Sequence, residues 1–126
     1  MVVEAALKQL GIDYREYPFR EGRLFFCKLP GNDLTFDLQY SEDGTIHLWR
    51  FVSGKFASWA GKRCEYRKPK DYHSAIGIDV SEDGETSLFV EQMIDENEPE
   101  QEAHIKRIIS SYVNLLSDSS IRSLIM

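Results

Sequence analysis

The stretch that decides the fold is LTFDLQYSEDGTIHLW, residues 34–49. Its first half alternates apolar and polar residues, which is the pattern of a half-buried strand. The apolar positions are Leu34, Phe36, Leu38 and Tyr40. Ser41-Glu-Asp-Gly44 favours a turn, because Asp and Gly tolerate the backbone conformations that turns need. The aromatic-rich segment TIHLWRFV (45–52) predicts a second strand, which forms a hairpin with the first.

The preceding run RLFFCKL (23–29) predicts a strand of its own, because it is apolar and is followed by the turn-forming residues 30–33. We therefore expect a three-stranded antiparallel meander. Cys27 lies inside this run and is interpreted as a small core residue. Cys64 is far from it and has no CxxC spacing, so we predict two free thiols and no zinc or redox pair.

A second hairpin is predicted from SAIGIDV (74–80), SEDG (81–84) and ETSLFVEQM (85–93). Its turn repeats the Ser-Glu-Asp-Gly of residues 41–44. The repeat indicates either an internal duplication or the selection of good turn chemistry twice, and the sequence leaves both open. We expect the two hairpins to join in one sheet.

Helices are predicted at both ends of the chain. Apolar residues at helical spacing precede Gly11, which suits the position after a helix end; they are Val3, Ala6, Leu7 and Leu10. A longer apolar face follows Pro99, which suits a first helical turn; it comprises Ile105, Ile108, Ile109, Tyr112, Leu115 and Leu116. A last short helix is predicted over Ile121–Ile125. We expect residues 53–73 to be mostly loop, with a helical turn over 56–60 left open.

The predicted fold class is therefore α+β: an antiparallel sheet, made of the three-strand meander plus the second hairpin, with N-terminal and C-terminal amphipathic helices. Its 126 residues, 42% of them hydrophobic and 29% charged, fit a single domain spanning 1–126. The chain is acidic, with a net charge of −6. No stretch approaches the roughly 20 apolar residues of a membrane span, and the first residues show no cleavage signal. We expect a cytoplasmic protein.

Motifs that could carry chemistry fail at their decisive positions. Residues 79–90 begin like a calcium-binding loop, but its twelfth position is Val90 rather than a bidentate carboxylate. Glycines 54 and 61 are too far apart for a phosphate-binding loop, and Arg63 stands where that motif needs Ser or Thr after the lysine. The three histidines have no partner at metal-ligand spacing, and a Cys64/His73 pair lacks a third member. We therefore predict no catalytic residues, no metal site and no cofactor.

The segment 55–70 is basic, with six Lys and Arg residues against one acid, and aromatic residues alternate with its charges. This combination is typical of a contact surface. The predicted partner-binding residues are Trp59, Lys62, Arg63, Tyr66, Arg67, Lys68 and Tyr72. Cations could neutralise phosphates while the tyrosines stack on bases, so a nucleic-acid-binding module using the basic loop 55–73 is one hypothesis. A sequence pI of 5.0 disfavours binding to a polyanion. It favours instead a basic segment that pairs with an acidic surface on this fold or on a protein partner.

The order of predicted elements resembles the type III secretion chaperone-like fold and the related YbjN-type sensory-transduction regulator family. The matching stretches are LKQLGID, LTFDLQYSEDGTIHLW, AIGIDVSEDGETSLFVEQ and HIKRIISSYVNLL. Such chaperones usually have a central helix where this chain has the basic loop. The resemblance implies a non-enzymatic, chaperone-like homodimer that presents apolar surface to a polypeptide partner and needs no cofactor.

Overall fold

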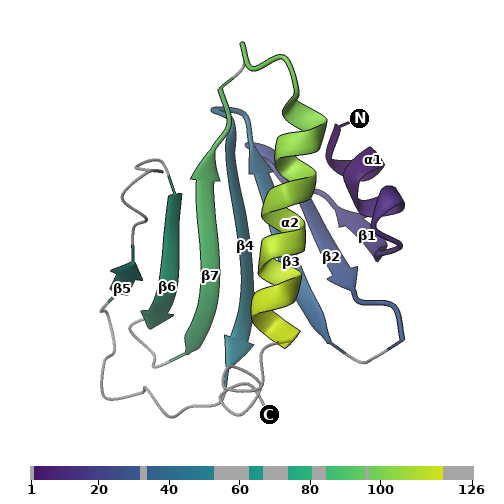
Figure 1. Ribbon diagram of the computed structural model, residues 1–126. Helices are drawn as coiled ribbons and strands as arrows, with labels where there is room; N and C mark the ends of the chain where they lie inside the picture. Colours follow the sequence, from purple (N-terminus) through teal and green to yellow (C-terminus); the bar gives the residue numbers. More distant parts are fainter. Residues whose placement is uncertain are drawn as a thin grey trace.

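The computed structural model describes residues 2–31, 34–52, 63–66, 74–80, 85–95 and 97–117. These residues form a seven-stranded antiparallel sheet in the order β1-β2-β3-β4-β7-β6-β5, with two helices, α1 and α2 (Figure 1). The strands are β1 (Asp13–Tyr17), β2 (Gly22–Lys28), β3 (Thr35–Ser41), β4 (Thr45–Val52), β5 (Arg63–Tyr66), β6 (Ser74–Val80) and β7 (Thr86–Met93). The helices are α1 (Val2–Gln9) and α2 (Gln101–Ser117). The predicted α+β fold class is confirmed.

The three-strand meander forms as predicted. Strand β3 pairs with β2 on one side and with β4 on the other, so that Leu38 lies opposite both Phe25 and Leu48. The turn between β3 and β4 depends on Gly44, whose φ is +91°. A Cβ atom there would also lie 2.6 Å from the carbonyl oxygen of Ile94, so the position admits only glycine without strain.

The two predicted hairpins join into one sheet through β4 and β7. These strands pair along their whole length, from Thr45 opposite Met93 to Val52 opposite Thr86. The second hairpin is formed by β6 and β7, which pair from Ser74 opposite Gln92 to Val80 opposite Thr86. The prediction of a single sheet is therefore correct, and β4 and β7 occupy its centre.

Two edge strands were not expected. Strand β1, DYREY, pairs only with β2 and has four exposed residues out of five, so it lacks the apolar alternation that identifies a strand. Strand β5 lies within residues 53–73, which the sequence predicted to be mostly loop, and it pairs with β6 through four residues. Both strands are short and charged, which is common at sheet edges.

Helix α1 ends as predicted. The φ of Gly11 is +71°, its N–H donates to the carbonyl of Lys8 and the N–H of Ile12 donates to that of Leu7. Helix α2 begins at Gln101, so the prediction that Pro99 lies in its first turn is wrong by two residues. The N–H of His104 donates to the carbonyl of Glu100, which places the helix start after the proline. The short helix predicted over 121–125 lies outside the described residues.

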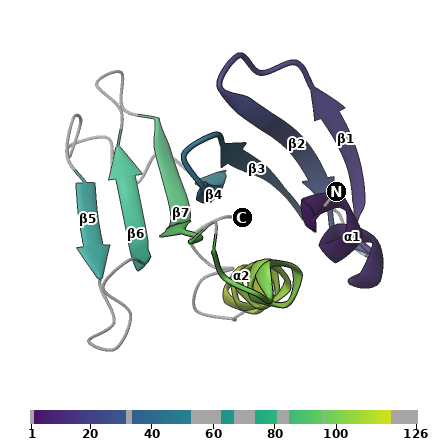
Figure 2. The same cartoon turned by 90° about the horizontal axis from the view of Figure 1, so that it is seen from above.

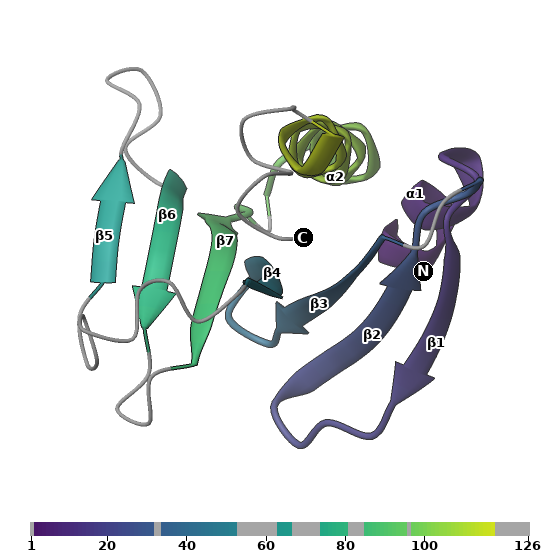
Figure 3. The same ribbon diagram turned by 90° about the horizontal axis from the view of Figure 1, so that it is seen from below.

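Both helices lie on one face of the sheet (Figures 2 and 3). On this helix-covered face Tyr112 packs edge-on against Phe36, with ring centroids 5.5 Å apart, and its hydroxyl donates to the carbonyl of Leu88 at 2.7 Å. The core shared by the sheet and the helices includes Val3, Leu7, Phe25, Cys27, Phe36, Leu38, Ile46, Leu48, Leu88, Ile105, Ile109, Tyr112 and Leu116. Within the described part of the chain, neither helix is long and apolar enough to cross a membrane.

Candidate functional site

The face of the sheet opposite the helices, here called the outer face, is the most distinctive surface of the protein. Because side chains alternate between the two faces of a strand, the residues beside each core position point to the outer face. They are Tyr17, Leu24, Phe26, Asp37, Gln39, His47, Trp49, Phe51, Phe89, Glu91 and Met93. Neither of the two described helices lies on this face (Figure 3).

Large apolar side chains are exposed on the outer face. Four of them keep about half of their surface in contact with solvent: Tyr17 (42%), Phe26 (40%), Phe51 (56%) and Met93 (50%). They come from four strands, β1, β2, β4 and β7, and therefore extend across much of the sheet. Single exposed apolar residues are ordinary, but several on one side of a sheet indicate a contact surface.

Cross-strand pairing arranges the outer face in rows. One row runs from Arg15 through Phe26, Asp37 and Trp49 to Phe89, each residue lying opposite the next on the neighbouring strand. Directly opposed side chains on one face are about 5 Å apart at Cβ, close enough to contact one another. The row therefore places a single carboxylate, Asp37, between two aromatic side chains.

Asp37 has no hydrogen bond or ion pair with any residue that the structure describes, although it is only partly exposed. Burial raises the pKa of its carboxyl above the ordinary value. Among the side chains that the structure describes, two cations share this side of the sheet: Lys28 lies at a diagonal position and Arg15 two strands away. Neither pairs with Asp37. The carboxylate thus keeps its hydrogen-bonding capacity for a group from outside this part of the chain.

The aromatic side chains of β4 and β7 form a packed group at the other end of the row. The His47 ring stacks on Trp49 with centroids 4.9 Å apart, and it meets Phe89 edge-on at 5.9 Å. Phe89 is fully buried although it lies outside the main core. These contacts fix the Trp49 side chain, so the indole next to Asp37 is held in place from one side.

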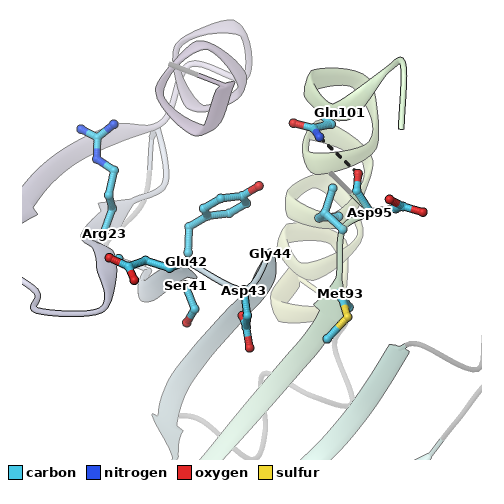
Figure 4. A pocket seen from close by; sticks show the side chains of 11 residues that line it. Arg23, Ser41, Glu42, Asp43, Gly44, Met93, Asp95 and Gln101 are labelled. Carbon is cyan, nitrogen blue, oxygen red and sulfur yellow. Dashed lines mark hydrogen bonds between the residues drawn. The ribbon is translucent and has the colours of Figure 1, made fainter. Parts of the chain in front are cut away.

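A separate hollow of about 730 Å³ lies at the end of the sheet, beside the turn between β3 and β4 (Figure 4). Two of its acidic residues, Asp43 and Asp95, accept hydrogen bonds within the neighbouring turns. Asp43 accepts a hydrogen bond from the N–H of Thr45, which lowers the pKa of the Asp43 carboxyl. Asp95 accepts from the N–H of Asn97 through its side chain and from the Gln101 amide through its carbonyl. Among the described residues, no group of three acid, His or Cys side chains could hold a metal ion.

Two residue types that often carry chemistry have structural roles here. Cys27 is fully buried, and its burial, together with the nearby Asp37 charge, raises the pKa of its thiol to about 12, so the nucleophilic thiolate does not form near neutral pH. His104 Nδ1 donates to Glu98 at 2.7 Å, and the Gln92 amide donates to His104 Nε2 at 2.6 Å. This histidine therefore ties the start of α2 to β7.

The predicted partner-binding residues lie for the most part outside the described residues. Arg63 and Tyr66 stand at the two ends of β5, where their backbones pair with Asp79 and Ile76 of β6. The others, which the structure does not describe, are Trp59, Lys62, Arg67, Lys68 and Tyr72. That the basic stretch contacts a protein partner therefore stays a prediction, as does the alternative that it binds nucleic acid.

The outer face was not predicted as a site, although the sequence carries its signal. Strands covered on one side alternate apolar and polar residues, whereas β2 contains Leu24-Phe25-Phe26 and β4 contains Leu48-Trp49 in succession. Consecutive apolar residues in a strand place one on each face. The lone Asp37 between such strands gives no sequence signal, because its neighbours are known only from the register.

Comparison with known proteins gives no relative: no protein family, curated protein or solved structure matches this chain. The similarity to chaperone-like regulators therefore stays a prediction.

Proposed function

We propose that this protein is a non-enzymatic, chaperone-like adaptor that binds a polypeptide partner on the outer face of its sheet, over strands β1 to β4. The observation that carries the proposal is the exposure of Tyr17, Phe26 and Phe51 on a face that neither described helix covers. Burying such side chains against a partner releases water from apolar surface, at about 25 cal/mol for each Å².

The architecture suits a binding surface. Three strands on either side of β4 hold the outer face rigid, since every described strand except the two at the edges is hydrogen-bonded on both sides. A rigid surface loses little side-chain freedom when a partner binds, which favours affinity. Aromatic residues are also enriched among the residues that dominate protein interfaces.

The proposal can be tested by selecting short random peptides displayed on phage against the purified protein. The same selection is carried out against the Phe26→Ser/Phe51→Ser variant, which removes two exposed rings but no core residue. A Ser111→Asp/Asn114→Asp variant, altered on the exposed side of α2, serves as the control. We expect peptides that bind the wild type and the control but not the outer-face variant. Equal selection by all three proteins, or no selection at all, would contradict the proposal.

The homodimer predicted from the sequence is a separate part of the proposal. Light scattering should return twice the chain mass of 14.6 kDa. The Phe26→Ser/Phe51→Ser variant is expected to keep the mass of the wild type, because the outer face is assigned to another polypeptide. A dimer that this variant alone dissociates would show that a second copy, and not a partner, occupies the outer face. A cytoplasmic location also stays a prediction.

A further inference from the structure

We propose that the outer face recognises an arginine side chain of its partner, with Asp37 accepting the guanidinium hydrogen bonds and Trp49 and Phe26 packing against its plane. The inference rests on the function proposed above and names the chemistry of the partner: a basic segment in which arginine stands among apolar residues.

Register provides the geometry. Asp37 on β3 lies opposite Phe26 on β2 and opposite Trp49 on β4, so two aromatic side chains stand on either side of one carboxylate. A guanidinium can donate two parallel hydrogen bonds to a carboxylate, and its planar face attracts the face of an aromatic ring. An ammonium group offers neither the planar fork nor the stacking face, so the arrangement favours arginine over lysine.

The lack of a hydrogen bond or ion pair between Asp37 and any described residue also favours an arginine ligand. Asp37 is partly buried, and burial makes its charged form less favourable, which raises the pKa of the carboxyl. When a guanidinium binds there, charge-assisted hydrogen bonds to the carboxylate replace the hydration that burial removes. The net charge of −6 on the whole chain adds a general attraction for a basic segment.

A second copy of this chain fits the outer face less well. A symmetric dimer uses the same patch on both partners, so it would place two Asp37 carboxylates in one interface. Among the outer-face side chains that the structure describes, only Arg15 and Lys28 carry a positive charge to set against them. An arginine-bearing partner instead places a positive charge beside Asp37, between the aromatic side chains of the row.

The probe pair that tests this inference is N-acetyl-arginine methylamide and N-acetyl-citrulline methylamide, which share their shape and differ in charge. Each is titrated into the full-length protein while the indole resonance of Trp49 is followed by NMR. We expect the arginine probe to bind at least about tenfold more tightly than the citrulline probe. Asp37→Asn should remove this preference. In Trp49→Leu, which lacks the indole reporter, the ring resonances of Phe26 are followed instead, and arginine binding should weaken about threefold. Glu42→Gln, which removes an exposed carboxylate in the turn after β3, should change neither value.

Equal affinity for the two probes, a preference that survives Asp37→Asn, or no shift at Trp49 with either probe would overturn the inference. These failures are distinct from failure of the proposed function. If phage selection yields peptides that need Phe26 and Phe51 but that carry no arginine, the outer face binds polypeptides and the role given to Asp37 is wrong.

Discussion

The two faces of the sheet are built from the same strands but differ in what their apolar residues contact. On the helix-covered face, Phe25, Leu38 and Leu48 are fully buried under α1 and α2. On the outer face, Phe26 is one residue after Phe25 on β2 and Phe51 is three residues after Leu48 on β4, and both remain about half exposed. The difference indicates that apolar residues on the first face stabilise the fold, whereas those on the second are available for binding.

One polar side chain on each face illustrates a second difference. The buried hydroxyl of Tyr112 on the helix-covered side is satisfied by the carbonyl of Leu88. Asp37 on the outer face has no such partner among the described residues. Because Asp37 is partly exposed, water can hydrate its carboxylate in the free protein, and a bound group can replace that water. The carboxylate is therefore accessible to an external ligand, as are the apolar residues beside it.

The largest effect is expected from Leu48→Ala on the helix-covered face. It removes a fully buried side chain between the sheet and α2 and leaves a cavity. The free energy of unfolding should fall by about 3 kcal/mol, measured by urea denaturation. A loss below about 1 kcal/mol would mean that this face is not the tightly packed core described here.

A smaller loss is expected from Tyr112→Phe, which keeps the ring contact with Phe36 and removes only the hydroxyl that donates to Leu88. We expect unfolding to become easier by about 1 kcal/mol, the usual net value of one hydrogen bond. The same urea titration measures it. An unchanged stability would show that the hydroxyl makes no net contribution.

Phe51→Ala on the outer face should change stability by no more than about 0.5 kcal/mol, because the ring is already 56% exposed. Binding of a phage-selected peptide to the same variant should weaken at least about fivefold, since truncating a central aromatic commonly costs more than 1 kcal/mol of binding. Isothermal titration calorimetry provides the affinity. A variant that loses several kcal/mol of stability instead would assign Phe51 to the core.

The smallest effect, of opposite sign, is expected from Asp37→Asn. Burial raises the pKa of this carboxyl in the folded protein above the ordinary value of 3.8, so the folded state holds the proton to higher pH than the unfolded chain does. The contribution of Asp37 to stability therefore falls as pH rises through its folded pKa, and the charged Asp37 is unfavourable at neutral pH.

Melting temperatures of wild type and Asp37→Asn should thus differ at pH 7, with the variant higher, and should converge as pH falls below the ordinary value of 3.8. Among the described residues, Phe26 and Trp49 lie directly opposite Asp37, and the titratable groups at the diagonals are Lys28 and His47. The substitution leaves all four in place, so the difference between the two proteins isolates the carboxylate. A variant that is less stable than the wild type at pH 7 would reveal a partner for Asp37 in the free protein.

Much of this fold could be predicted because hydrophobic alternation and turn chemistry act locally. The repeated Ser-Glu-Asp-Gly motif and the flanking apolar residues identify β3, β4, β6 and β7 without tertiary information. Strand β1 could not be found in this way, since DYREY is stabilised as a strand by its pairing with β2 rather than by its own pattern. The start of α2 was misplaced because Pro99 is compatible with positions just before a helix as well as within its first turn.

The candidate site could not be predicted for a related reason. Whether Phe26 or Phe25 faces the helices depends on the register of β2, and a shift of one residue would exchange the two faces. The position of Asp37 between Phe26 and Trp49 combines the registers of two strand pairs. The basic segment was predicted to be a contact surface because a run of charges can be recognised in the sequence, whereas cross-strand neighbours cannot.

The most direct test of the central claim, that the outer face binds polypeptides while the helix-covered face maintains the fold, is an NMR titration with a phage-selected peptide. The side-chain resonances of Phe26, Trp49 and Phe51 report the outer face, and those of Leu48 and Ile109 report the core. Saturable shifts at the first three, with the last two unchanged, are the predicted result. Shifts concentrated on α1 and α2, with Phe26, Trp49 and Phe51 unaffected, would contradict the account.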